Sequence, residues 1–132
     1  MAKTSFESKL LNHVPNIKHG FLTREIGEDY ERAAQSFGLK NRTHLIPLRQ
    51  VHGATIIPVK DHKQCEDHQD DNRYEADGLL TATPHIGLAI RTADCTPILF
   101  ASKCGTLIGA VHAGWRGATG EIIETMTEAF EQ

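Results

Sequence analysis

The sequence has few of the features that mark membrane or secreted proteins. Aromatic residues make up only 6% of its 132 residues, and there is a single tryptophan. No apolar run reaches the length of about eighteen residues that spans a bilayer. The N-terminus also has no apolar segment of the kind found in secretory signal peptides. These absences predict a cytoplasmic protein with no membrane partner.

The sequence also has few cysteines and no excess of positive charge. The three cysteines, Cys65, Cys95 and Cys104, have no C-x-x-C spacing, which argues against a disulfide framework or a zinc ribbon and fits a reducing compartment. The net charge of −3 argues against nucleic acid as a partner, because general binding to it needs clustered Lys and Arg. The length and an apolar fraction of 39% predict a single globular domain over residues 1–132.

Short apolar segments separated by turn residues dominate the middle of the chain. We expect strands at 17–23, 44–50, 55–59, 78–81, 87–92, 98–101 and 107–111. Pro47 and Pro58 should push two of these strands toward sheet edges. Helices are expected near the two ends, at 28–37 and 121–130, and a polar surface loop at 61–75. These elements predict an α+β fold with a mixed or antiparallel β-sheet and flanking helices.

Three short motifs place a metal-ligand side chain near the end of a predicted strand. They are RQVHG with His52, RTADCTP with Cys95 and HAGWRG with His112. Because strands end where a sheet opens into loops, we expect these side chains to meet at one rim. Two imidazoles and a thiolate suit zinc, and three protein ligands with a vacant fourth position are typical of a catalytic site. The motifs lie too far apart for a local zinc knuckle, so the fold must assemble the site.

The segment after His112 has features of an anion site. Gly114 and Gly117 remove side chains, which lets the backbone approach a ligand. The helix that follows from about residue 119 should point its N-terminal N–H groups at the same rim, where they would favour phosphate. Arg116 is a candidate phosphate ligand, with a solvated surface cation as the alternative. Trp115 is expected to pack, or else to stack on a base.

Two aspartates near the motifs are expected to support the site rather than bind metal. Asp94 should face away from Cys95, because neighbouring residues on a strand point to opposite faces. Asp77 has either a tight-turn role before Gly78 or a supporting role. Another set of metal-ligand types, at three-residue spacing, falls in the polar loop, where such residues often go unused: His62, Cys65 and His68.

The phrases HGFLTR, RQVHG, ADGLLT, AIRTADCTPILF and GAVHAGWRG closely resemble the YfiH/YlmD family. This family is also called laccase-domain or multicopper polyphenol oxidase-like and, more recently, purine nucleoside phosphorylase. The resemblance implies zinc held by His52, Cys95 and His112, and a fold similar to the cytotoxic necrotizing factor catalytic domain. It implies phosphorolysis of adenosine, inosine and methylthioadenosine, together with adenosine deamination. The expected partners are therefore purine nucleoside and phosphate, with Arg24 as a second phosphate ligand.

The sequence departs from the usual family pattern in two places. Residues 25–40 form a short segment without the Asn of an SLNLG-like phrase, and the usual family chain continues well beyond the HAGWRG helix. We therefore expect a shortened domain. Its open sheet edges would favour a homo-oligomer.

Three other functions fit the same residues. A copper-dependent polyphenol oxidase would use the same ligands with a weak axial methionine, although Met126 belongs to the apolar stripe of the last helix. A metal-free Cys–His hydrolase would use Cys95 as nucleophile and His112 or His52 as base. An inactive short relative would keep the ligands and act as a binding domain. The leading prediction is a zinc-dependent purine nucleoside phosphorylase.

Overall fold

A four-stranded mixed sheet forms the centre of the fold in the computed structural model, which describes residues 5–92, 95–114 and 116–131, with the backbone alone at 116–118. The strand order is β4-β5-β8-β7. The β4–β5 pair is parallel, and β8 pairs antiparallel with both β5 and β7. The bounds are β4 Ile56–Val59, β5 Gly78–Thr81, β7 Thr96–Ala101 and β8 Ile108–Ala113.

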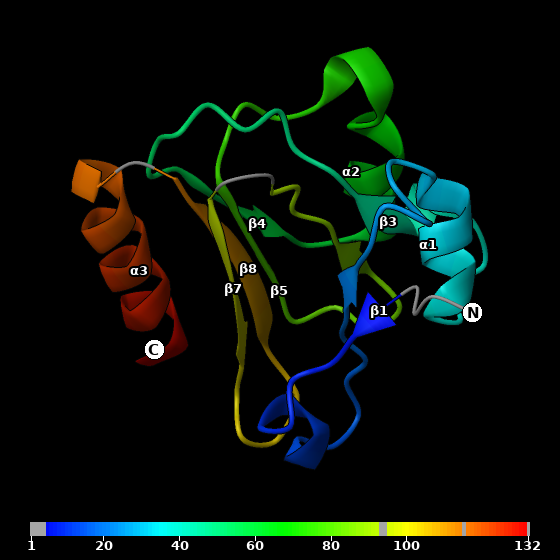
Figure 1. Cartoon of the computed structure of the whole chain (residues 1–132), viewed down its shortest axis with the longest axis horizontal. Helices are drawn as coiled ribbons and strands as arrows, with labels where there is room; N and C mark the ends of the chain where they lie inside the picture. Colours follow the sequence, from blue (N-terminus) through cyan, green and yellow to red (C-terminus); the bar gives the residue numbers. More distant parts are fainter. Residues whose placement is uncertain (1–4, 93–94, 115, 132) are drawn as a thin grey trace.

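The two faces of this sheet are covered by different parts of the chain (Figure 1). Helix α3, Arg116–Glu131, lies on one face, whereas α1, α2 and β3 lie on the other. These last three span Tyr30–Ser36, His62–Asp67 and Leu45–Ile46. Two small sheets complete the fold, β1 (Ser5–Phe6) with β2 (Phe21–Leu22) and β3 with β6 (Gly87–Leu88). None of the helices in the described ranges has the length and apolarity needed to cross a bilayer.

Helix α3 packs directly on β8. Val111, Ile122 and Met126 are fully buried there. A Cβ built on Gly109 would lie 2.8 Å from the Met126 Sδ atom, so the absence of a side chain at Gly109 allows this close approach. This contact fixes the helix against β8.

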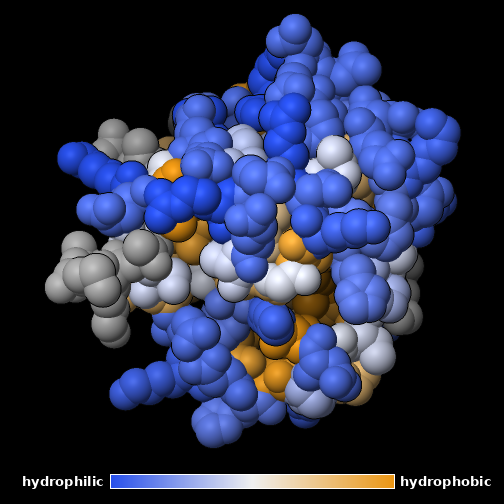
Figure 2. Space-filling view, turned by 90° about the vertical axis from the view of Figure 1, so that its right-hand side faces the viewer, coloured by the Kyte–Doolittle hydropathy of each residue, from blue (hydrophilic) through white to orange (hydrophobic). Residues whose placement is uncertain are grey.

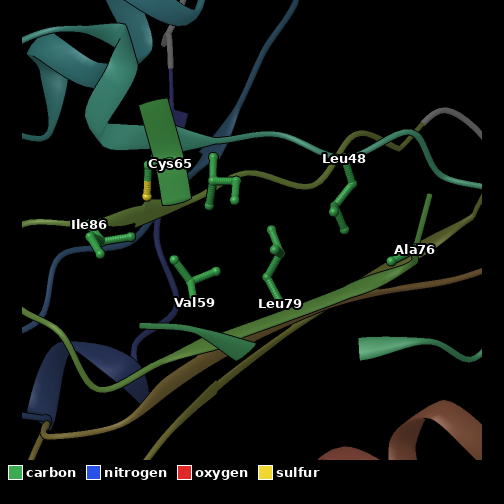
Figure 3. Close-up of a cluster of buried hydrophobic side chains, with 7 residues drawn as sticks. Leu48, Val59, Cys65, Ala76, Leu79 and Ile86 are labelled. Carbon is green, nitrogen blue, oxygen red and sulfur yellow. The ribbon is translucent and has the colours of Figure 1, made fainter. Parts of the chain in front are cut away.

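A second apolar core lies on the opposite face of the sheet. The side chains of Leu48, Val59, Cys65, Leu79 and Ile86 point into a common interior (Figure 3). Cys65 comes from α2 and Leu79 from β5, so this core joins the helical side of the molecule to the central sheet. Through Leu79, β5 packs against this core.

The structure confirms the α+β class and most of the expected elements. β5 matches its predicted range, and Pro58 lies on β4 at the sheet edge, as expected. The strands expected at 17–23, 44–50 and 87–92 are each reduced to two residues: Phe21–Leu22, Leu45–Ile46 and Gly87–Leu88. The last helix begins at Arg116, earlier than expected.

The prediction of a polar loop at 61–75 is wrong. This segment contains α2 and a 3₁₀ helix, Asp70–Asn72. The Asp61 carboxylate accepts a hydrogen bond from the Gln64 N–H, 2.8 Å away, and so caps the start of α2. Only Cys65 is buried in this helix, so the sequence has no apolar stripe that would reveal it.

A groove of about 620 Å³ lies between the segment 16–20 and the central sheet. On the side of the molecule that carries β1 and α1, apolar side chains gather in a hollow surrounded by hydrophilic ones (Figure 2). The groove lining includes Phe37, Leu39, Leu88, Leu99 and Ile108. None of the three predicted metal ligands lines this groove, so the candidate chemistry lies elsewhere.

Candidate metal centre

One edge of the central sheet brings the three motifs together. Because β8 runs antiparallel to β5 and β7, its end lies beside their beginnings, and the parallel β4 begins at the same edge. His112 is in β8 opposite Pro97, and Cys95 immediately precedes β7. His52 lies in the turn that leads to β4. The strand pairing therefore places a thiol and two imidazoles at one rim.

The ligand atoms of His52, Cys95 and His112 all lie within 4.8 Å of one another. The Cys95 Sγ atom is 4.0 Å from the His52 Nε2 atom, and the two imidazole rings have centroids 5.0 Å apart. Tetrahedral zinc with these donors separates its ligand atoms by about 3.5 Å, so small side-chain movements would complete the coordination. This is the one metal-ligand group of three found within the described ranges.

Gly114 leaves open the space that these side chains surround. A Cβ built on Gly114 would lie 2.6 Å from His52 Cδ2, 2.8 Å from His112 Cε1 and 3.1 Å from Cys95 Sγ. A methyl group at this point would contact all three side chains at once. The donor set and the open space together fit a metal ion.

Asp77 organises two of the three ligands. Its carboxylate has no solvent exposure and accepts four hydrogen bonds. Three come from the consecutive backbone N–H groups of Val51, His52 and Gly53, at 3.0, 3.1 and 2.9 Å. The fourth comes from His112 Nδ1, 2.8 Å away. The turn that directs these N–H groups at one carboxylate places His52 at a φ of 61°, a conformation that non-glycine residues rarely adopt.

The protonation state of Asp77 determines the tautomer of His112. Burial favours the neutral acid, but the hydrogen bonds from His112 and from the N–H groups of the 51–53 turn outweigh it and hold the pKa of the Asp77 carboxyl below its ordinary 3.8. An ionised carboxylate only accepts hydrogen bonds, so His112 Nδ1 carries the proton. In the neutral imidazole, Nε2 is then the atom with a lone pair for a metal.

The sequence also predicts roles for Arg24, Arg116, Asp94 and Trp115. Arg24 is exposed and lies four residues before Glu28, whose carboxylate pairs with Arg91 at 2.8 Å. Arg116 is the first residue of α3, but its side chain lies outside the described residues. Asp94 and Trp115 also lie outside the described residues. Phosphate binding by Arg24 and Arg116 therefore stays a prediction.

The other set of potential ligands does not form a cluster. Cys65 is fully buried in the core, whereas His68 stacks on Tyr74 with ring centroids 3.8 Å apart. His62 Nδ1 instead lies 3.1 Å from His44 Nδ1. Cys65 belongs to the apolar core, while His62 and His68 contact His44 and Tyr74, so the three side chains do not share a site.

The three free cysteines are expected to react with an alkylating reagent in a fixed order. Cys104 is exposed, and hydrogen bonds with Thr106 and Ser102 lower the pKa of its thiol, so it should react first. Burial, reinforced by the carboxylates of Asp61 and Glu66, raises the pKa of the Cys65 thiol to about 11, so it should react only on unfolding.

Zinc should protect Cys95 from the same reagent and leave Cys104 unprotected. Peptide mass spectrometry after timed alkylation, with and without added zinc, measures both rates. Equal protection of Cys95 and Cys104 would show that zinc does not act at the rim.

Comparisons with known proteins agree with this architecture. Residues 19–132 match the family described as multi-copper polyphenol oxidoreductase laccase. A purine nucleoside phosphorylase from Deinococcus radiodurans is 38% identical over 105 residues, which cover 80% of this chain and 38% of that protein. The purine nucleoside phosphorylase YfiH of Escherichia coli is 34% identical over 83 residues, covering 63% of this chain and 31% of that protein.

Solved structures show the same relationship. YlmD from Geobacillus stearothermophilus superposes with a TM-score of 0.68 at 31% identity, covering 79% of this chain and 39% of that one. The hypothetical protein YfiH from Bacillus licheniformis gives a TM-score of 0.67 at 28% identity, with the same two coverages. The chain thus spans about two fifths of the length of these structures. The resemblance seen in the sequence is confirmed, and the chain belongs to the multi-copper polyphenol oxidoreductase laccase family.

Proposed function

We propose that this chain carries the zinc site of a purine nucleoside phosphorylase, with His52, Cys95 and His112 as the ligands. The observation that supports this most directly is the convergence of the three ligand atoms within 4.8 Å around the space left by Gly114. The relatives named purine nucleoside phosphorylase supply the substrate class. When bound, zinc would act as a Lewis acid toward an oxygen of substrate or water.

The chain's own residues have distinct tasks in this proposal. Asp77 orients His112 through Nδ1 and shapes the turn that carries His52. The backbone N–H groups at the start of α3 follow Gly114 closely and favour an anion such as phosphate at the rim. Arg116 and Arg24 would add positive charge for phosphate, which would attack the ribose C1′ while the bond from C1′ to the purine nitrogen breaks and the base leaves. Adenosine, inosine and methylthioadenosine are the proposed substrates, and adenosine deamination would use the same site.

The donor set favours zinc over copper. Two imidazoles and a thiolate form a copper electron-transfer site when a methionine lies on the axis. Met126 is the methionine of the described residues, and it is fully buried between α3, to which it belongs, and Gly109 of β8. That packing leaves it unavailable as an axial ligand at the rim.

Metal analysis combined with nucleoside turnover tests the proposal. The purified protein should contain about one zinc per chain and release purine base from adenosine or inosine only when phosphate is present. Cys95→Ala should lose both the zinc and the activity. Cys104→Ala is the matched control, because it removes an exposed thiol away from the three ligands and should keep both properties.

Each alternative function gives a different result in this experiment. Copper with oxidation of phenols would favour the oxidase, and a Cys95-dependent hydrolysis without metal would favour the thiol hydrolase. Bound zinc without turnover at any phosphate concentration would favour a binding domain. A homo-oligomer and a cytoplasmic location stay predictions of the sequence.

A further inference from the structure

Gln50 joins the chain segment of one proposed ligand to that of another. Its side-chain Oε1 accepts a hydrogen bond from the Arg91 N–H at 2.7 Å, and its Nε2 donates to the Arg91 carbonyl at 2.6 Å. Both ends of the amide therefore hold the backbone of a single residue. Gln50 lies two residues before His52, and Arg91 lies four residues before Cys95.

The segment that carries Gln50 is fixed on both sides. The Arg49 N–H donates to the Tyr74 carbonyl at 2.9 Å, and the Ala76 N–H donates to the Arg49 carbonyl at 3.1 Å. On the other side, Asp77 holds the turn of residues 51–53. Gln50 thus projects from a backbone that residues 74–77 hold in place, and its side chain fixes the Arg91 backbone relative to it.

Among the described residues that lead to Cys95, fewer backbone groups bond to other parts of the fold. The Ala89 N–H donates to the Ile46 carbonyl at 3.0 Å, and β7 begins at Thr96 opposite Ala113. The Thr92 hydroxyl donates to the Cys95 carbonyl, a contact within the same segment. The Arg91 side chain pairs with Glu28, but both groups are largely exposed, and such ion pairs contribute little.

We propose that Gln50 is a positioning residue, which holds the backbone of Arg91 against the segment that carries His52 and so helps to set the Cys95 thiolate in reach of the metal. This role rests on the proposed metal site. Gln50 does not contact the ligand atoms itself but acts through the Arg91 backbone. Loss of its two hydrogen bonds releases Cys95 while His52 and His112 stay fixed by Asp77.

A cobalt titration of a Gln50→Met variant tests this role. Methionine keeps the length of the side chain and removes both hydrogen bonds. With Co²⁺ as the probe, wild-type protein should show a thiolate-to-cobalt charge-transfer band together with the weaker d–d bands. Gln50→Met should bind Co²⁺ on the order of 10- to 100-fold more weakly. Its charge-transfer band should fall relative to the d–d bands, because Cys95 leaves the metal before the histidines do.

Gln64→Met is the matched control. Gln64 is also half-buried and also holds backbone with both ends of its amide: it accepts from the Lys60 N–H at 2.8 Å and donates to the Pro58 carbonyl at 2.9 Å. These contacts lie at the end of β4 that is remote from the metal-ligand rim. Gln64→Met should therefore keep the wild-type cobalt spectrum even if its thermal unfolding temperature falls.

The outcomes separate this role from the proposed function. A wild-type protein without the charge-transfer band overturns the metal site and the role of Gln50 with it. A normal band in both wild type and Gln50→Met overturns the role of Gln50 alone. An equal loss of the band in Gln64→Met also overturns it, because the effect would then reflect general destabilisation.

Discussion

Gly114→Ala is expected to abolish metal binding while the protein stays folded. The added methyl group would lie 2.6 Å from His52 Cδ2, 2.8 Å from His112 Cε1 and 3.1 Å from Cys95 Sγ, so it would crowd the space between the three ligands. We expect zinc affinity to fall on the order of 100-fold or more, since direct occlusion should exceed the effect of losing a supporting contact. Stability should change by only about 1 kcal/mol, because Gly114 is exposed at the end of β8.

Gly120→Ala provides the control for Gly114→Ala. A Cβ at Gly120 meets nothing within 4 Å, and alanine favours the helical conformation of α3 by about 1 kcal/mol. This variant should bind zinc as wild type does and unfold at a slightly higher temperature. Calorimetric titration with zinc and thermal unfolding measure both effects. Wild-type zinc affinity in folded Gly114→Ala would show that the three side chains do not enclose a metal.

The elements that the sequence predicted best are those whose pattern reflects a single packing face. The last helix buries Ile122 and Met126 against β8, and this stripe is visible in the sequence. β5 likewise appears as an apolar run bounded by Asp77-Gly78. The sequence predicts too late a start for the last helix. Gly117 and Gly120 lie inside its first turns, and glycine usually weakens a helix.

Helix α2 shows why an apolar pattern is not sufficient. Its stability depends on the Asp61 cap and on Gln64, which accepts from the Lys60 N–H. Aspartate followed three residues later by glutamine is a recognised start signal for a helix, so the information was present in the sequence. A helix of six residues with a single buried side chain has no apolar periodicity, so the pattern of apolar residues does not reveal it.

The ligand residues of the candidate site could be predicted from the sequence, but their arrangement in space could not. The three ligand types were visible in their motifs, whereas their convergence depends on strand order, which no local pattern specifies. The antiparallel pairing of β7 with β8 brings Cys95 beside His112. The sequence does not decide between a turn role and a supporting role for Asp77, because its four donors come from parts of the chain that only the fold brings together.

Asp77→Asn should lower both stability and metal affinity. An asparagine has one acceptor oxygen, so its NH₂ group would face N–H donors that now bond to a carboxylate. Leaving such groups unsatisfied at a fully buried position costs about 3 kcal/mol in the free energy of unfolding. Without the bond to His112 Nδ1 and with a loosened His52 turn, we expect zinc affinity to fall on the order of 10- to 100-fold.

Asp70→Asn separates this effect from a simple loss of charge. Asp70 pairs with Arg42 at 3.4 Å, but both side chains are about half exposed, so its neutralisation should cost less than about 1 kcal/mol and leave zinc binding unchanged. Urea unfolding and zinc titration of the two variants give the comparison. If Asp77→Asn loses stability but binds zinc normally, then Asp77 supports only the fold of the turn. A combined loss means that one buried carboxylate both stabilises the sheet edge and presents two of the three ligands, because the same four hydrogen bonds do both.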